Sequence, residues 1–289
     1  MSRIVVLLTA VVALVAAQPR FRADLDVVNV TVTVTDKGGR FVSGLQKDDF
    51  IVLEDGRPRD VVFFAGESAP VSLGILLDAS GSMTGTKLSL ARQAIARLVT
   101  NDVDATTEWL LARFTATVVV AQDWTADRAA IVQPLRETRA TGDTSLYDAV
   151  ALTIPIVGDG HNLKKSLLVV SDGVESKSLL SLRDVQTAIG ESDVRVYGLG
   201  IDALDAKRGE RLNIETLRRL SDDTGAHTWT VSNAAEIPAA TLRLADELRH
   251  QYLLGFATTA VKNGQRHSIK VEVRGRGHAV AVRRGYVAG

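Results

Sequence analysis

The chain has 289 residues, of which 46% are apolar and 24% charged, as in a globular protein with one large domain and a smaller one. Lys plus Arg and Asp plus Glu number 34 each and aromatic residues make up 5%, which argues against a nucleic-acid partner or a base-stacking surface. The absence of cysteine excludes disulfides, thiolate metal sites, cysteine nucleophiles and a bacterial lipoprotein anchor.

The first 17 residues have the pattern of a signal peptide. A short basic start at Arg3 precedes an apolar run over residues 4–17, which ends in small residues before Gln18. A retained membrane anchor is the alternative, but the run is shorter than the roughly 20 residues of a spanning helix. We therefore expect residues 1–17 to be cleaved, no transmembrane segment in the mature chain, and a secreted or periplasmic location.

Residues 24–66 are predicted to form an N-terminal β segment. The run 27–34 is β-branched almost throughout and ends in a turn, and further short strands are expected at 41–42, 50–53 and 61–64. This segment has too few strands to be stable alone.

Strands and helices alternate from residue 71 to residue 249. The expected strands are 71–77, 108–114, 116–122, 166–171, 194–200 and 226–231, and the expected helices are 87–99, 126–134, 144–157, 180–189, 214–220 and 235–249. This alternation predicts an α/β fold, a Rossmann-like doubly wound and mostly parallel sheet. No helix fits between strands 108–114 and 116–122, so one of the two must run antiparallel, at an edge.

The period-two pattern returns in residues 250–286, with strands expected at 252–256, 267–273 and 279–283. Neither flank can close a core by itself. We therefore expect the N- and C-terminal segments to pair into a small antiparallel β-sandwich, with the α/β domain of residues 71–249 inserted between them.

The most informative pattern follows the first strand of the α/β domain. Asp78, Ser80 and Ser82 stand at alternate positions after a buried-looking apolar run, where open α/β sheets place their ligands. A carboxylate with hydroxyls is a hard oxygen set that suits Mg²⁺ or Mn²⁺. The alternative is that the two serines cap the following helix.

Two later loops complete the pattern, with Thr144 before a helix and Asp172 after a second buried-looking strand. With Asp78, Ser80 and Ser82, these residues resemble the metal-ion-dependent adhesion site (MIDAS) of a von Willebrand factor type A (VWFA) domain. The resemblance implies that all five residues bind the metal. It also implies that an Asp or Glu side chain of a protein ligand completes the metal shell.

Two acidic residues beside Thr144 leave questions open. Asp143 stands where the family pattern has glycine, and its charge could strengthen cation binding yet weaken an acidic ligand. Asp148 lies one helical turn after Thr144. It either orients a group at the site or is an acid favoured by the helix dipole.

The flanks are similar to those of exported VWFA-related proteins of Acidobacteria, on the strings DFIVLEDG at 49–56 and QYLLGF at 251–256. This resemblance supports export and the β–α/β–β architecture more than a particular role.

Three functions follow, in this order of preference. The first is a non-enzymatic, exported binding protein that captures a protein ligand through the metal, as in cell adhesion. The second is a structural or scaffolding subunit of an envelope complex, in which the metal only stabilises the loops. The third is a metal-assisted hydrolase, disfavoured because none of the five histidines lies in a site loop and no G-x-S-x-G, Walker or H-E-x-x-H motif is present.

Overall fold

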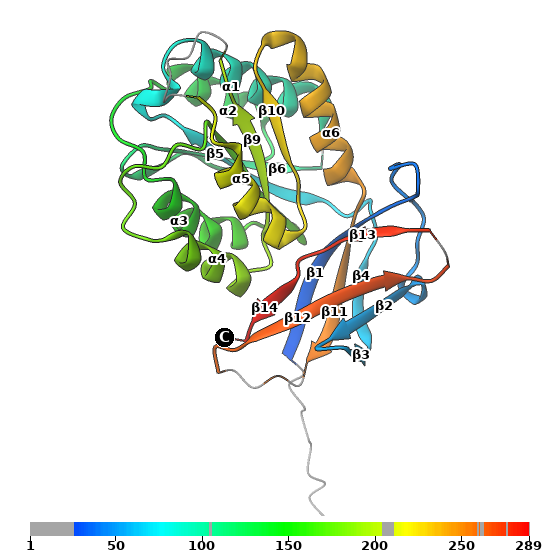
Figure 1. The fold of residues 1–289 in the computed structure, drawn as a ribbon. Coiled ribbons are helices and arrows are strands. Elements are labelled where there is room, and N and C mark those ends of the chain that lie inside the picture. The colour runs from blue at the N-terminus through cyan, green and yellow to red at the C-terminus, as the bar shows by residue number, and fades with distance from the viewer. Residues whose placement is uncertain are drawn as a thin grey trace, which may run out of the picture.

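The computed structural model describes residues 26–103, 106–203, 211–258, 260, 263–275 and 277–288. Figure 1 shows an α/β unit, in which helices surround a sheet, and a smaller all-β unit packed against one end of it. The expected signal peptide at residues 1–17 lies outside the described residues.

The α/β unit is built on a six-stranded sheet with the order β10-β9-β8-β5-β6-β7. Its strands are β5 (Val71–Asp78), β6 (Glu108–Phe114), β7 (Val118–Thr125), β8 (Lys164–Ser171), β9 (Arg195–Ile201) and β10 (Thr228–Val231). Neighbouring strands pair in parallel except β7, which runs antiparallel to β6 at the edge, as predicted. All eight residues of β5 are buried, as expected for a central strand of a sheet covered on both faces.

Helices cover both faces of this sheet. They are α1 (Thr86–Arg97), α2 (Arg128–Glu137), α3 (Leu146–Gly158), α4 (Leu182–Glu191), α5 (Ile214–Ser221) and α6 (Ile237–Arg249). Short turns of other helix types are η1 (Lys47–Asp49), η2 (Gly81–Met83), η3 (Leu98–Asp102), η4 (Asp222–Thr224) and η5 (Ala234–Glu236). Leu73, Ile75 and Leu77 share a core with α1, α2 and α6, whereas Leu76 shares another with α3, α4 and α5. Because strand side chains alternate between faces, this division confirms the doubly wound fold.

The all-β unit consists of two antiparallel sheets, ordered β13-β1-β11-β4 and β14-β12-β2-β3. Its strands are β1 (Asp26–Thr35), β2 (Phe50–Glu54), β3 (Arg57–Arg59), β4 (Val61–Ala65), β11 (Gln251–Thr258), β12 (Arg266–Val273), β13 (Ala279–Ala281) and β14 (Gly285–Val287). β1 pairs with β11 along most of its length, from Asp26 opposite Thr258 to Thr33 opposite Gln251. The two ends of the chain therefore build one sandwich around a shared core, as the fold prediction stated.

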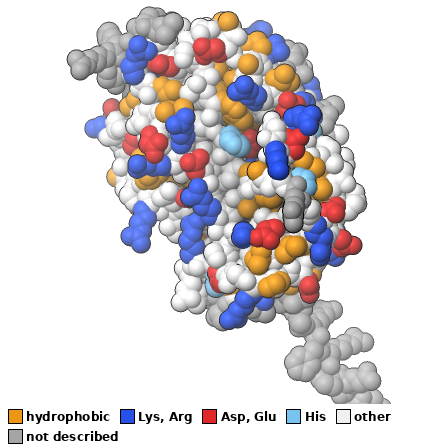
Figure 2. Space-filling model, turned by 45° about the vertical axis from the view of Figure 1, so that its right-hand side comes forward, with side chains coloured by type: hydrophobic (Ala, Val, Ile, Leu, Met, Phe, Trp, Pro, Cys, Tyr) orange, Lys and Arg blue, Asp and Glu red, His pale blue; other side chains and the backbone are white. Residues whose placement is uncertain are grey.

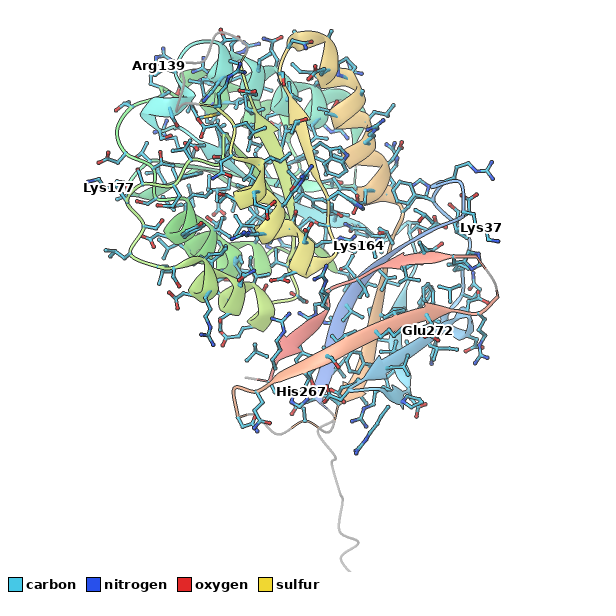
Figure 3. The ribbon with its side chains drawn as sticks, viewed as in Figure 1. Lys37, Arg139, Lys164, Lys177, His267 and Glu272 are labelled. Carbon is cyan, nitrogen blue, oxygen red and sulfur yellow. The ribbon has the colours of Figure 1, made fainter. Side chains whose placement is uncertain are left out.

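The connections fix which end of the α/β unit faces the sandwich. β4 of the sandwich leads into the start of β5, and α6 leads directly into β11. The amino ends of the parallel strands therefore face the sandwich, and their carboxyl ends point away from it. In Figure 3, Lys164 at the start of β8 lies on the side toward the sandwich, whereas Arg139 and Lys177 lie at a distance from it.

Several strand predictions needed correction at the sheet edges. The strand expected at 116–122 is found at Val118–Thr125, and residues 41–42 form only an isolated bridge at Phe41. The strand expected at 279–283 is shortened to β13 at Ala279–Ala281, and the unpredicted β14 follows at Gly285–Val287 in the other sheet. The unpredicted β3 contains Pro58, which is tolerated because β3 is an edge strand.

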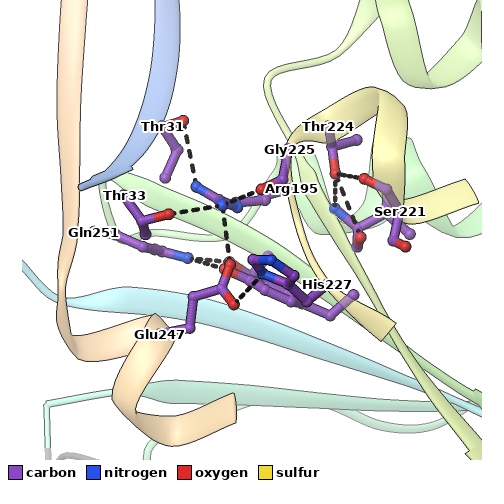
Figure 4. Close-up of polar contacts among 12 residues, drawn as sticks. Thr31, Thr33, Arg195, Ser221, Thr224, Gly225, His227, Glu247 and Gln251 are labelled. Atoms are coloured by element: carbon purple, nitrogen blue, oxygen red, sulfur yellow. Dashed lines mark hydrogen bonds and ion pairs between the residues drawn. The ribbon is translucent and has the colours of Figure 1, made fainter. Parts of the chain in front are cut away.

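Buried charges join the two units (Figure 4). Arg195 of β9 is 1% exposed and forms an ion pair of 2.9 Å with Glu247 of α6. The Arg195 guanidinium also donates to Thr33 Oγ1 of β1 at 3.1 Å and to the carbonyl of Gly225. Because the partners come from the sandwich as well as the α/β unit, this cluster fixes how the units meet.

The face drawn in Figure 2 carries charged side chains of both signs. On the face in Figure 2, acidic side chains stand among the basic ones and among hydrophobic side chains, in agreement with the equal numbers of each charge. Among the described helices, none combines the length and the apolar character that crossing a bilayer requires.

Candidate metal centre

The first loop of the site follows β5, at the end of the sheet remote from the sandwich. β5 ends at Asp78, whose side chain is completely buried. Asp78 Oδ1 accepts a hydrogen bond from the Ser80 backbone N–H at 2.9 Å, and the hydroxyl oxygens of Ser80 and Ser82 lie 3.1 Å apart. The alternative that the serines cap α1 is wrong, because the N-cap of α1 is Gly85, whose φ of 69° favours glycine.

The second loop is hydrogen-bonded to the first. The Thr141 N–H donates to the Ala79 carbonyl at 2.8 Å, and the Gly81 N–H donates to the Gly142 carbonyl at 2.9 Å. Thr144, which was predicted to begin a helix, instead lies in this loop, because α3 begins only at Leu146. Thr144 is 4% exposed, so its side chain is held against the neighbouring loops.

The third loop follows β8 and touches both of the others. Ser171, the last residue of β8, donates its hydroxyl to Asp78 Oδ2 at 2.6 Å, and the next residue, Asp172, is completely buried. The Thr144 carbonyl accepts hydrogen bonds from the N–H groups of Ser176 and Lys177 at 3.1 and 3.0 Å. The structure thus brings the loops of all five predicted residues to one edge of the sheet.

Lys87 is a residue of the site that the sequence analysis missed. Its Nζ lies 2.7 Å from Asp172 Oδ2, and the two side chains are 3% and 0% exposed. The other carboxylate oxygen of Asp172 accepts the Val174 N–H at 3.1 Å. A lysine in the first turn of an amphipathic helix is normally a surface residue, and only tertiary packing places this one inside.

The local chemistry fits a divalent cation. Burial raises the pKa of Asp78 to about 6, with a smaller contribution from the neighbouring Asp172 carboxylate, so nearby positive charge would stabilise the ionised form. In the described part of the chain, no hydrogen bond to the Thr144 hydroxyl is present, although the residue is buried. Two carboxylates and three hydroxyls are hard donors that suit Mg²⁺ or Mn²⁺.

The donor set depends on its hydroxyl groups. The described residues contain no cluster of three or more His, Cys, Asp or Glu side chains placed to hold a metal ion. An ion at this edge would therefore be held by Asp78 and Asp172 together with the hydroxyls of Ser80, Ser82 and Thr144. That set leaves room for water or an outside ligand on a six-coordinate ion.

Asp148 has a role that neither sequence interpretation described. Its carboxylate accepts the N–H groups of Leu179 and Leu180, at 2.9 Å for the shorter Leu179 contact and 2.9 Å for Leu180. In return, the Ser178 hydroxyl accepts the Tyr147 N–H at 3.0 Å at the start of α3. These reciprocal bonds fix the third loop against α3, with the Leu179 side chain 95% exposed.

The remaining polar residues lie at the rim or far from the site. Asp143 is exposed, so its charge faces solvent next to Thr144. His161 pairs with Glu108 at the start of β6, and His267 pairs with Asp55 in the sandwich, both away from the carboxyl edge of the sheet.

The fold and the site together define a class: a doubly wound α/β domain with carboxylate and hydroxyl oxygens gathered where three loops meet at the carboxyl edge of its sheet. Residues 73–243 match the von Willebrand factor type A domain, and the chain belongs to that family. The search of curated protein sequences found no match.

Solved structures share this fold at low sequence identity. An aerotolerance-related membrane protein from Bacteroides fragilis is 17% identical, with a TM-score of 0.53 over 62% of this chain and 98% of that one. A von Willebrand factor type A protein from Catenulispora acidiphila is 13% identical, with a TM-score of 0.54 over 93% and 75%. Proximal thread matrix protein 1 from the mussel byssus, solved with a zinc-occupied MIDAS motif, is 13% identical, with a TM-score of 0.51 over 68% and 49%.

Proposed function

We propose that this protein is an exported, non-enzymatic binding protein that captures a protein ligand through a divalent cation. The observation that carries the proposal is the meeting of three loops at the end of the α/β unit remote from the sandwich. There Asp78 is buried with a raised pKa, and the hydroxyl of Thr144, a residue only 4% exposed, has no hydrogen-bond partner among the described residues. A bound cation would stabilise such a group of oxygens, because it favours the ionised form of the carboxylate and accepts the hydroxyl oxygens as ligands.

The ion would be held by Asp78, Ser80, Ser82, Thr144 and Asp172, and we propose Mg²⁺ or Mn²⁺ on the basis of the hard donors. When bound, the ion offers an open coordination position to a carboxylate of the partner. The zinc-occupied MIDAS motif of the mussel protein supports a divalent ion at the equivalent place, and Zn²⁺ therefore belongs among the ions tested.

The protein ligand would present an Asp or Glu side chain to this ion. The rim around the site is open to such a partner, since Asp143, next to the buried Thr144, and Leu179 of the third loop are both exposed. Leu179 is held in place through its backbone by Asp148, so the rim offers a fixed apolar contact rather than a freely moving one.

Export and domain organisation are part of the proposal. Residues 1–17 would be removed as a signal peptide, residues 24–66 and 250–286 would form the sandwich domain, and residues 71–249 the binding domain. The basic start, the apolar run and the flanks similar to exported Acidobacteria proteins support a secreted or periplasmic location.

A scaffolding role is the second candidate, and one observation favours it. The Lys87–Asp172 ion pair and the backbone hydrogen bonds among the loops hold the site together without a metal. In that case an ion would add stability but no partner.

An array of short peptides separates the two candidates. Each peptide carries one Asp or Glu in a neutral sequence, and its matched control carries Asn or Gln instead. Fluorescently labelled mature protein should bind acidic peptides in the presence of Mg²⁺ or Mn²⁺ and release them in EDTA. It should not bind the amide controls under either condition. Binding that persists in EDTA, or the same signal on amide controls, would contradict capture through a metal.

A further inference from the structure

Lys87 occupies an unusual place for a lysine. It lies in the first turn of α1, is 2% exposed, and directs its ammonium at Asp172. Burial disfavours a charged side chain, and the amino end of a helix disfavours positive charge in particular. The contact with the buried carboxylate helps to offset both costs.

The ion pair changes the charge of the site. Asp78 and Asp172 ionised carry two negative charges, and among the ion pairs of the described residues Lys87 compensates one of the two, that of Asp172. The uncompensated charge falls on Asp78, whose hydrogen bonds within the described part of the chain come from a backbone N–H and a hydroxyl and not from a cation. A divalent cation added to this group would leave the loaded site with one net positive charge.

We infer that Lys87 is an internal counter-cation that sets the metal affinity of the site and stabilises the loops when no metal is bound. This inference rests on the proposed metal site. Without metal, the ammonium keeps Asp172 paired in a place that excludes water. With metal, the same ammonium repels the ion, so the site binds it more weakly but remains positive enough to attract a carboxylate ligand.

Two substitutions separate the charge of Lys87 from its hydrogen bond. Lys87→Gln can still donate to Asp172 but carries no charge, whereas Lys87→Arg keeps the charge. A matched control is Lys177→Gln, which removes an exposed positive charge from the third loop, where the Lys177 side chain points into solvent (Figure 3). The measurements are the Kd for Mn²⁺ and Mg²⁺ by titration calorimetry and the melting temperature in EDTA.

Lys87→Gln should bind Mn²⁺ at least about tenfold more tightly than wild type, because a unit charge this close to a divalent ion is only partly screened. Its melting temperature in EDTA should fall, because Asp172 then lies buried without a cation. Lys87→Arg and Lys177→Gln should both bind Mn²⁺ within about twofold of wild type, since screening weakens an exposed charge.

The outcomes distinguish this inference from the proposed function. Equal Mn²⁺ affinity in wild type and Lys87→Gln would overturn the role of Lys87 while the metal site stands. If neither protein binds Mn²⁺ or Mg²⁺, the metal site itself is refuted. If Lys87→Gln fails to fold, Lys87→Arg decides the matter: a Kd more than tenfold from wild type would show that shape, and not charge, sets the affinity.

Discussion

The junction with the sandwich and the loop edge at the other end of the α/β unit both bury charged side chains. At the junction, each oxygen of Glu247 has a cationic or potentially cationic partner, Arg195 at 2.9 Å and His227 at 2.8 Å. At the loop edge, Lys87 compensates Asp172, and the partners of Asp78 among the described residues are a hydroxyl and an N–H group. The junction is balanced within the protein, whereas among the described residues the two buried carboxylates of the loop edge have one paired cation between them.

That difference separates a structural cluster from a binding site. A buried ion pair whose charges are matched holds elements in register and needs nothing from outside. A buried carboxylate without a cation, beside hydroxyls, gains stability from an ion that the chain does not supply. Changes at the junction should therefore alter stability and leave metal binding intact, whereas changes to the site residues at the loop edge should alter metal binding.

The largest effect is expected from Glu247→Ala. The change leaves the Arg195 guanidinium buried without its carboxylate, which should lower the free energy of unfolding by about 3–5 kcal/mol. Urea unfolding of the variant and wild type measures this. Metal affinity should be unchanged, because the junction and the site lie at opposite ends of the sheet.

Two controls sharpen that result. Glu215→Ala removes a carboxylate that is 61% exposed and pairs with Arg219 on α5. This change should lower the free energy of unfolding by less than about 1 kcal/mol. The double variant Arg195→Met, Glu247→Met should recover much of the loss, since an apolar pair can replace a buried ion pair. If Glu247→Ala lowers the free energy of unfolding no more than Glu215→Ala does, the Arg195–Glu247 pair does not hold the junction.

Asp148→Ala tests whether the third loop is held by α3. The carboxylate accepts the Leu179 and Leu180 N–H groups, and losing it should cost about 1–3 kcal/mol. Hydrogen exchange should show faster exchange at those two amides and no change in β11 of the sandwich. Unchanged exchange at Leu179 and Leu180 would mean that other contacts fix the loop.

Thr144→Ala decides between a binding protein and a scaffold. If the threonine hydroxyl helps to hold an ion that captures an acidic ligand, the Kd of the variant for acidic peptides should rise at least tenfold. This is a loss of about 1.4 kcal/mol of binding free energy. Ser145→Ala, next to it at the start of α3, is the matched control and should retain binding. A variant that only loses part of its metal-dependent stabilisation and still binds peptide would favour the scaffold.

The smallest effect should come from His227. Its hydrogen bond with Glu247 raises its pKa above the usual 6.5, so the folded protein holds the proton more tightly than the unfolded chain. The resulting stabilisation is fully present below pH 6.5 and is lost as the pH rises through the raised value. Because the His227 side chain is 63% exposed, this contribution to the free energy of unfolding should remain under about 1 kcal/mol.

The stabilisation by His227 is measured by unfolding wild type and His227→Gln at several pH values between 5.5 and 8.5 and comparing their free energies of unfolding. Wild type should lose more stability than the variant as the pH rises through this range. Identical pH profiles would show that the His227–Glu247 contact contributes nothing in solution.

How far the sequence predicts this protein depends on how local each signal is. Asp78, Ser80, Ser82 and Asp172 were found because each follows the end of a buried strand, and the carboxyl ends of parallel strands meet at one edge. Whether these residues bind a metal stays a prediction. The fold class was predictable for a similar reason, because the local periodicity of apolar residues indicates which segments are strands and which are helices.

What the sequence did not reveal depends on contacts between distant residues. Arg195 and Glu247 are 52 positions apart, and nothing near either residue indicates that both are buried. Lys87 and Asp172 are 85 positions apart, and Lys87 has the local pattern of an exposed helix residue. The edge strand β3 was missed because Pro58 argues against a strand unless its place at the edge is known.

Thermal unfolding with and without divalent ions tests the central claim most directly. Mature wild-type protein and Asp78→Asn are melted in EDTA and in millimolar Mg²⁺, Mn²⁺, Ca²⁺ or Zn²⁺. An ion that binds only the folded state raises the melting temperature, by an amount equivalent to about 2.7 kcal/mol at a hundredfold excess over Kd. The account predicts this rise with Mg²⁺ or Mn²⁺ for wild type and none for Asp78→Asn. No rise with any ion, or an equal rise in both proteins, would contradict it.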